Sequence, residues 1–218
     1  MTQHNIANSS REALRLKLPR LLAPYGVDVS DELAGQIVRY VSVLSYWNKK
    51  INLTSLRDAE SIVQRHFGES FFAARVVGVD LCGRLADVGT GAGFPGLALK
   101  ILRPGLQVIL IESNAKKAAF LSEVQRELGL KGVEILRKRL KDVDISADSL
   151  DIVTARAVGH FEELLAWARR AIKADGRLLL WLGAADATDL GALPGWKWDS
   201  PVLIPLSRQR YILVGRRL

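Results

Sequence analysis

The sequence predicts an α/β protein in which a Rossmann-like, mainly parallel sheet of seven strands follows a helical N-terminal extension. Three observations lead to this fold class. Apolar side chains recur at helical spacing over residues 1–80, short apolar runs alternate with helical stretches over residues 81–218, and a glycine-rich loop joins the first of these runs to a helix. Strands that alternate with helices imply crossover connections and therefore parallel pairing. We expect residues 1–80 to form the extension and residues 81–218 to form the sheet domain.

Three helices are expected in the extension. The first runs from near Ser10 to Leu22 and ends where proline and glycine follow. Ser30 is a typical N-cap residue for the second helix. The apolar residues of that helix recur at helical spacing, namely Leu33, Ile37, Val41, Leu44 and Trp47. The third helix begins near Asp58 and includes His66.

Strands and crossover helices alternate in the sheet domain. The predicted strands are Leu85–Val88, Val108–Glu112, Val133–Leu136, Leu150–Ala155, Arg177–Leu182, Val202–Leu206 and Tyr211–Val214. The predicted helices between them are Phe94–Leu102, Ala115–Leu128 and Phe161–Ile172. The last two strands are close together in the chain, so we expect an antiparallel pair added to the edge of the sheet.

The composition excludes several classes of protein. Of the 218 residues, 49% are hydrophobic and 25% are charged, which is ordinary for a globular protein. The single cysteine excludes an intramolecular disulfide framework and a cysteine-based zinc cluster, and we expect no bound metal. No apolar run is long enough to span a membrane, and the N-terminus lacks the apolar stretch of a signal peptide. We therefore expect a soluble, cytoplasmic protein that is a monomer.

The charge balance points to an acidic partner. There are 31 basic and 23 acidic residues, for a net charge of +8. A positive field of this size favours polyanions, above all nucleic acid. Lys49 and Lys50, the run from Arg137 to Lys141 and the arginines near the C-terminus are candidate phosphate contacts.

The segment from Asp87 to Gly96 reads D-V-G-T-G-A-G-F-P-G and is the most informative part of the chain. It follows the first strand and opens the first crossover helix, where open α/β sheets bind their ligands. Residues 91–96 also satisfy the dinucleotide pattern G-x-G-x-x-G, and Glu112 lies at about the distance expected of a ribose-binding acid.

Two residues of this loop disfavour a pyrophosphate ligand. The Asp87 carboxylate would repel phosphate, and Pro95 removes a backbone N–H from the start of the helix. A carboxylate in this place suits a ligand with a cationic amine and no phosphate, such as S-adenosylmethionine. Two alternatives remain open. In the first alternative, Asp87 binds no ligand and is a turn-capping carboxylate. In the second, Glu112 binds no ligand and is an ordinary exposed strand end.

Five segments together carry a resemblance to a known family. Trp47–Thr54 resembles the pattern W-N-x-x-x-N-L-T, and His66–Ser70 resembles H-x-x-D-S with glutamate in place of aspartate. Asp87–Gly96 resembles the family's cofactor loop, and Glu112–Leu121 resembles its segment after the second strand. Arg156–Val158 resembles its R-A-V motif. With these motifs in order, the chain from about Ser30 to Arg210 resembles the RsmG (GidB) family, bacterial methyltransferases of small-subunit ribosomal RNA.

The resemblance implies a class I S-adenosylmethionine-dependent methyltransferase fold. It also implies methyl transfer to N7 of a guanosine in the decoding-region loop of 16S ribosomal RNA, with that RNA or the small ribosomal subunit as partner. The residues we expect to bind the cofactor are Asp87, Gly89, Thr90, Gly91, Gly93, Phe94, Glu112, Arg139, Leu140 and Arg156. Those we expect to bind RNA are Lys49, Lys50, Asn52, His66, Lys116, Lys117 and Arg210.

Methylation at guanine N7 needs no general base, because N7 carries a lone pair and no proton. The rate would come from alignment and from exclusion of water. Arg156, at the end of the fourth strand, is the candidate catalytic residue and would contact O6 or a phosphate. Its alternative role is an ion pair with a nearby acid. His66 fits ligand contact and a structural role equally well. Asn48, Asn52 and Thr54 fit either an ordered loop over the pocket or local turn hydrogen bonds.

The chain departs from the family pattern at two places. Leu182-Gly183 stands where the family has Lys-Gly, and Arg139-Leu140-Lys141 stands where it has R-A-E. Leu182 is the reason to keep the first of three other functions open, and the remaining two are independent alternatives. The three are an RNA- or ribosome-associating paralogue with an altered target or little turnover, a methyltransferase of a small molecule or protein, and a nicotinamide dehydrogenase.

Overall fold

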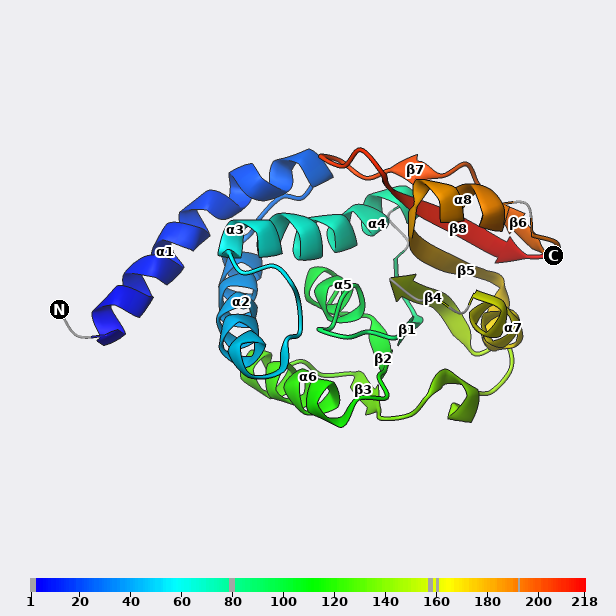
Figure 1. The fold of residues 1–218 in the computed structure, drawn as a ribbon, viewed down its shortest axis with the longest axis horizontal. Coiled ribbons are helices and arrows are strands. Elements are labelled where there is room, and N and C mark those ends of the chain that lie inside the picture. The colour runs from blue at the N-terminus through cyan, green and yellow to red at the C-terminus, as the bar shows by residue number, and fades with distance from the viewer. Residues whose placement is uncertain (1–2, 79–80, 157–158, 160, 192) are drawn as a thin grey trace.

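A central sheet with helices on both faces forms the body of the protein (Figure 1). The computed structural model describes residues 3–78, 81–156, 159, 161–191 and 193–218. The sheet has eight strands, in the order β3-β2-β1-β4-β5-β8-β6, and β7 also pairs with β8. The α/β class and the mainly parallel sheet predicted from the sequence are confirmed.

The extension is helical, as predicted. Its elements are α1 (Gln3–Leu22), η1 (Ala23–Tyr25), α2 (Asp31–Ile51), α3 (Ala59–Ile62), η2 (Val63–Gly68) and α4 (Glu69–Val77). The Ser30 hydroxyl caps α2 by accepting a hydrogen bond from the Leu33 N–H at 3.2 Å. The Asp58 carboxylate caps α3 in the same way. η2 has π-helical hydrogen bonding, which is often found at functional sites, and it contains His66.

Five parallel strands follow. They are β1 (Arg84–Val88), β2 (Gln107–Ile111), β3 (Val133–Leu136), β4 (Leu150–Arg156) and β5 (Ile172–Gly183). The connecting helices are α5 (Gly96–Leu102), α6 (Ala115–Leu128), the short η3 (Leu140–Asp142) and α7 (Phe161–Ala171). The carboxyl ends of the five parallel strands lie along one edge of the sheet, so the residues that follow each strand gather there.

The C-terminal part differs from the prediction in one strand and one helix. β8 (Arg210–Arg217) runs antiparallel beside β5, and β7 (Val202–Leu203) pairs with β8, so the antiparallel pair is confirmed. β7 ends at Leu203 and not at the predicted Leu206, which has a positive φ and lies in the turn. The sheet has one strand more than the seven predicted, because β6 (Trp196–Trp198) also pairs with β8. This strand has only three residues, and its partner is distant in sequence, so no local pattern marks it. Helix α8 (Ala184–Gly191) was not predicted either.

The two faces of the sheet bury separate clusters of side chains. Leu179 and Trp181 of β5 pack with α1, α2, α4, α5 and α6, whereas Leu178 and Leu180 face α7 and α8. The helices of the extension therefore share one core with the sheet. The expected boundary at residue 80 lies outside the described residues. Among the helices that are described, none combines the length and apolar character needed to cross a membrane.

Tyr40 of α2 anchors the glycine-rich loop. Its side chain is fully buried, its hydroxyl donates a hydrogen bond to the Ala92 carbonyl at 2.7 Å, and its ring stacks on Phe94 with 5.2 Å between centroids. Gly93 has a φ of +82°, and a Cβ there would lie 2.1 Å from the Tyr40 hydroxyl oxygen. Glycine is required at 93 because helix α2 approaches the loop so closely.

We predict that Tyr40→Phe lowers the free energy of unfolding by about 1–3 kcal/mol, because the buried Ala92 carbonyl would lose its donor. Urea unfolding measures this change. The matched control is Tyr46→Phe on the same helix, whose exposed side chain should change stability by less than about 0.5 kcal/mol. Equal effects of the two substitutions would show that the Tyr40 hydrogen bond does not hold the loop.

Candidate functional site

Two pockets lie at the carboxyl edge of the sheet. The first, here named the Glu112 pocket, has a volume of about 500 Å³ and is lined by Val88, Gly89, Ile111, Glu112, Ser113, Lys138, Arg139, Leu140, Lys141 and Glu163. The second, the Arg156 pocket, has a volume of about 290 Å³ and is lined by Glu69, Arg156, Phe161, Trp181, Leu182, Gly183, Asp186, Ile204 and Arg210. One pocket follows β1 and β2 and the other follows β4 and β5, so both belong to the edge where such sheets bind ligands.

The Asp87 carboxylate lies inside the protein, beneath the loop. It is fully buried, and it accepts hydrogen bonds from the Gly96 N–H at 2.9 Å and the Thr154 hydroxyl at 2.8 Å. Burial raises the pKa of Asp87 to about 6. These bonds tie the loop to β4, which is the turn-capping role left open above. Contact between Asp87 and a cationic amine stays a prediction.

Glu112 lines its pocket and is buried. Its Oε2 accepts a hydrogen bond from the Gly91 N–H at 3.0 Å, and its Oε1 accepts one from the Asn114 N–H at 2.8 Å. These two bonds fix the carboxylate plane. Each carboxylate oxygen has a further lone pair, so the group can still accept hydrogen bonds from two neighbouring hydroxyls of a ligand.

The Glu112 pocket fits a nucleoside ligand. Val88, Ile111 and Leu140 supply apolar walls, and the volume falls in the usual range of about 300–1,000 Å³ for small-molecule sites. At Gly91, φ is +57° and a Cβ would meet no atom nearer than the Gly89 carbonyl oxygen at 3.8 Å. Unlike Gly93, Gly91 therefore faces open space, and a backbone without side chains leaves room for a ligand.

Glu69 organises the Arg156 pocket. It is 1% exposed, and its Oε2 accepts a hydrogen bond from Arg156 Nη2 at 3.0 Å. Its Oε1 accepts two from Arg210, from Nε at 2.9 Å and from Nη2 at 2.7 Å. Arg156 also donates to the Arg65 carbonyl at 3.0 Å. Arg156 thus makes the ion pair left open as its alternative role, and two guanidinium groups share one carboxylate.

The sequence did not single out Glu69 as a functional residue. The only signal for it was its place in the segment His66–Ser70, where it stands for the aspartate of the family pattern. Burial lowers the pKa of Arg156, and the Glu69 carboxylate opposes this shift. Glu69 therefore compensates the charge of a guanidinium that is largely withdrawn from water.

His66 is held between the extension and the loop. Its Nε2 lies 2.8 Å from the Thr54 hydroxyl, and its ring stacks on Phe94 with 4.7 Å between centroids. The Asn48 side chain pairs with both the N–H and the carbonyl of Thr54, each at 2.9 Å. Asn48 and Thr54 thus make the local turn hydrogen bonds. Asn52 is the C-cap residue of α2 and has a φ of +49°.

The cationic residues predicted to bind RNA lie in two places. Arg210 lines the Arg156 pocket. The exposed Lys49 and Lys50 end α2, and Lys116 and Lys117 begin α6. These two helices are neighbours, because Trp47 contacts Phe120 with 6.0 Å between ring centroids. Neither lysine pair lines one of the two pockets. Ala157 and Val158 of the R-A-V segment lie outside the described residues.

The parallel sheet, the glycine-rich loop and the pockets at its carboxyl edge define the class I S-adenosylmethionine-dependent methyltransferase fold. A solved S-adenosylmethionine-dependent methyltransferase from Aquifex aeolicus is similar to this chain with a TM-score of 0.61 and 16% identity, over 72% of this chain and 93% of that chain. At this identity the likeness concerns the fold alone.

Sequence comparisons define the family. The profile of the GidB family, described as rRNA small subunit methyltransferase G, matches residues 34–194. Ribosomal RNA small subunit methyltransferase G of Xanthomonas campestris pv. campestris (strain B100) is 37% identical over 187 residues, which cover 84% of this chain and 86% of the relative. The protein of the same name from Erwinia tasmaniensis is 34% identical over 206 residues, covering 92% and 98%. This chain belongs to the GidB family, as the motifs predicted.

Burial and the nearby guanidinium groups of Arg156 and Arg65 lower the pKa of His66 to about 3. The unfolded chain should bind a proton at this histidine below about pH 6.5, where the folded protein does not. The stabilising contribution of neutral His66 is therefore complete above about pH 6.5 and is lost as the pH falls.

We predict that wild type loses about 2 kcal/mol more stability than His66→Gln between about pH 7.5 and pH 5. Asp87 acts in the opposite direction below about pH 6, because its pKa is raised, but it is present in both proteins and cancels in the comparison. Urea unfolding at the two pH values gives the result. An equal loss in both proteins would assign the titration to another group.

Proposed function

We propose that this protein transfers a methyl group from S-adenosylmethionine to N7 of a guanosine in the decoding-region loop of 16S ribosomal RNA. The observation that carries the proposal is the pair of pockets at one edge of the sheet, in a member of the GidB family. One pocket suits a nucleoside, and the other suits a planar base. The net charge of +8 suits an RNA substrate.

S-adenosylmethionine, when bound, supplies an electrophilic methyl group on a sulfonium. Glu112 would accept hydrogen bonds from the ribose hydroxyls, and the apolar wall at Leu140, with the backbone at Arg139, would lie against the adenine. The open backbone at Gly91 would lie along the methionine part, as would the rest of the loop, namely Asp87, Gly89, Thr90, Gly93 and Phe94. Arg156, which lines the second pocket, would contact the cofactor from that side.

The Arg156 pocket would receive the guanine. Trp181 and Leu182 supply apolar walls, and the Arg156 guanidinium can donate to O6 while N7 stays free to react. No residue has to remove a proton, because N7 has none. The chain's contribution to the rate is then alignment of N7 with the methyl group and exclusion of water.

The lysines at the ends of α2 and α6 would contact RNA phosphates outside the pockets. Contacts of this kind fix the orientation of a nucleic acid and depend strongly on salt. We further propose that the substrate is the 16S RNA or the small ribosomal subunit, that the protein acts as a monomer, and that it works in the cytoplasm.

The direct test incubates the protein with methyl-labelled S-adenosylmethionine and unmodified small ribosomal subunits, and maps the label by cleavage at 7-methylguanosine. We expect one labelled guanosine in the decoding-region loop. Glu112→Gln should weaken binding of S-adenosylmethionine by about 10- to 100-fold in calorimetric titration, because a charged acceptor is lost. The matched control is Glu134→Gln, an exposed glutamate of β3, which should bind as wild type does. Absence of transfer by wild type with cofactor bound would contradict the proposal.

Leu182 favours a second candidate function, an RNA- or ribosome-associating paralogue with little turnover. Leu182 lies in the Arg156 pocket and is buried. The family pattern that the chain resembles has lysine at this position. If this candidate is right, Leu182→Lys should raise the methylation rate of small subunits by at least about tenfold, equivalent to about 1.4 kcal/mol of barrier. Leu182→Met, which keeps the volume without the charge, is the control. An unchanged or lower rate of Leu182→Lys would remove this candidate.

A further inference from the structure

The turn between β7 and β8 presents an apolar side chain to solvent beside the Arg156 pocket. Leu206 is 67% exposed and sits in this turn with a φ of +60°. A residue with a Cβ adopts such a left-handed conformation only at an energetic cost. Both the left-handed backbone of Leu206 and the exposure of its apolar side chain to water are therefore energetically unfavourable. The side chain is also not part of the core.

Hydrogen bonds within the turn hold this conformation. The Ser207 hydroxyl accepts from the Arg210 N–H at 2.9 Å, and the Ser207 N–H donates to the Ile204 carbonyl at 3.1 Å. The Ile204 N–H donates to the Arg210 carbonyl at 2.9 Å and closes the turn. The exposed leucine is therefore presented on a fixed backbone.

The two ends of the turn are built into the Arg156 pocket. Ile204 and Arg210 both line it, and Arg210 is fixed by its two bonds to Glu69. The position of Leu206 relative to the pocket is therefore set by the same contacts that shape the pocket. Val202 and Leu203, on the strand before the turn, are exposed as well.

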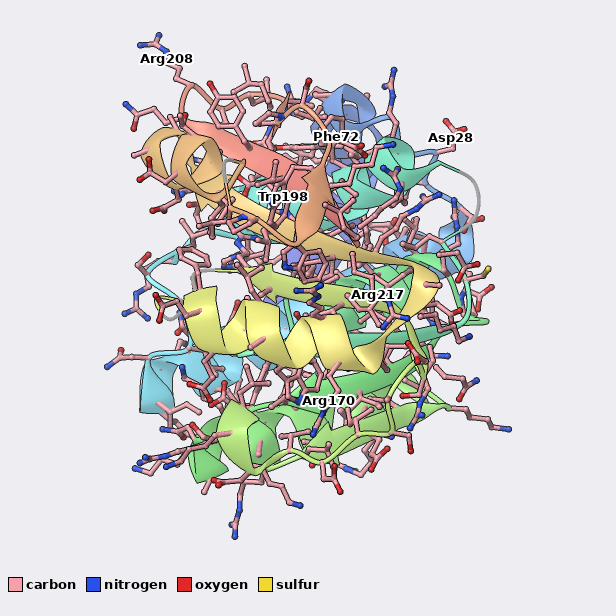
Figure 2. The ribbon with its side chains drawn as sticks, turned by 90° about the vertical axis from the view of Figure 1, so that its right-hand side faces the viewer. Asp28, Phe72, Arg170, Trp198, Arg208 and Arg217 are labelled. Atoms are coloured by element: carbon pink, nitrogen blue, oxygen red, sulfur yellow. The ribbon has the colours of Figure 1, made fainter. Side chains whose placement is uncertain are left out.

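The turn itself carries two arginines, Arg208 and Arg210. Arg208, two residues after Leu206, projects into solvent at the end of the molecule beside α8 (Figure 2). Within the described part of the chain it makes no ion pair. An apolar side chain among arginines suits a nucleic acid, whose bases are apolar on their faces and whose phosphates are anionic.

We propose that Leu206 is a wedge that enters the base stack next to the target nucleotide, while the target base turns into the Arg156 pocket and Arg208 holds a neighbouring phosphate. This inference rests on the proposed function and names a positioning residue for it. Many enzymes that modify a base turn it out of the stack into their active site, and an apolar side chain can fill the gap that the base leaves.

The test uses Leu206→Gly and Leu206→Met with small ribosomal subunits as substrate. Glycine tolerates a φ of +60°, so Leu206→Gly should be at least as resistant to urea as wild type. We expect it to lower kcat/KM for methylation at least about tenfold, with binding of S-adenosylmethionine unchanged, and we expect Leu206→Met to keep most of the activity. The control is Leu218→Gly, a 74% exposed leucine beyond the far end of β8, which should act as wild type does. Full activity of Leu206→Gly would overturn the proposal.

A photo-crosslinking side chain at position 206, with small ribosomal subunits, separates the proposal from its rivals and from the proposed function. We expect a crosslink to a nucleotide next to the target guanosine. A crosslink to a ribosomal protein, or none to RNA, would overturn the wedge even if methylation is intact. If wild type does not methylate subunits, the proposed function fails, and the crosslink still decides whether this turn contacts the RNA stack.

Discussion

A buried aromatic stack is the constraint on which the rest of the site depends. Phe94 of the glycine-rich loop lies between the ring of Tyr40 and the ring of His66, so the loop is held from two sides by the helical extension. The extension is therefore a structural part of the site. Its position fixes the loop backbone, and the loop in turn fixes Glu112 through the Gly91 N–H.

A second constraint is electrostatic. Arg156 of β4 and Arg210 of β8 are far apart in the sequence, and they share the buried Glu69 carboxylate in the first turn of α4. A buried charge is tolerated when it is paired and hydrogen-bonded, and removal of one partner leaves the other uncompensated. The neutral state of His66 fits this arrangement, because a protonated imidazole would add a further cation beside Arg156 and Arg65.

Local patterns predicted the helices, the parallel strands and the loop well, because caps, helical spacing and glycine positions depend on neighbouring residues. The Ser30 and Asp58 caps are examples. Strand β6 was missed, since its pairing with β8 lies outside any local window. The same limit explains why the sequence did not identify Glu69 as a functional residue. Its two arginine partners are separated from it by 87 and 141 positions.

The sequence by itself determined the fold class, the family and the place of the glycine-rich loop. Only the tertiary structure decided where the functional side chains point. It turned the Asp87 carboxylate inward to Thr154 and left the Glu112 carboxylate lining a pocket, although Asp87 lies near the end of β1 and Glu112 directly after the neighbouring strand β2. The physical reason is that a side chain's partners come from packing between strands and helices distant in the chain, which periodicity along the sequence does not contain.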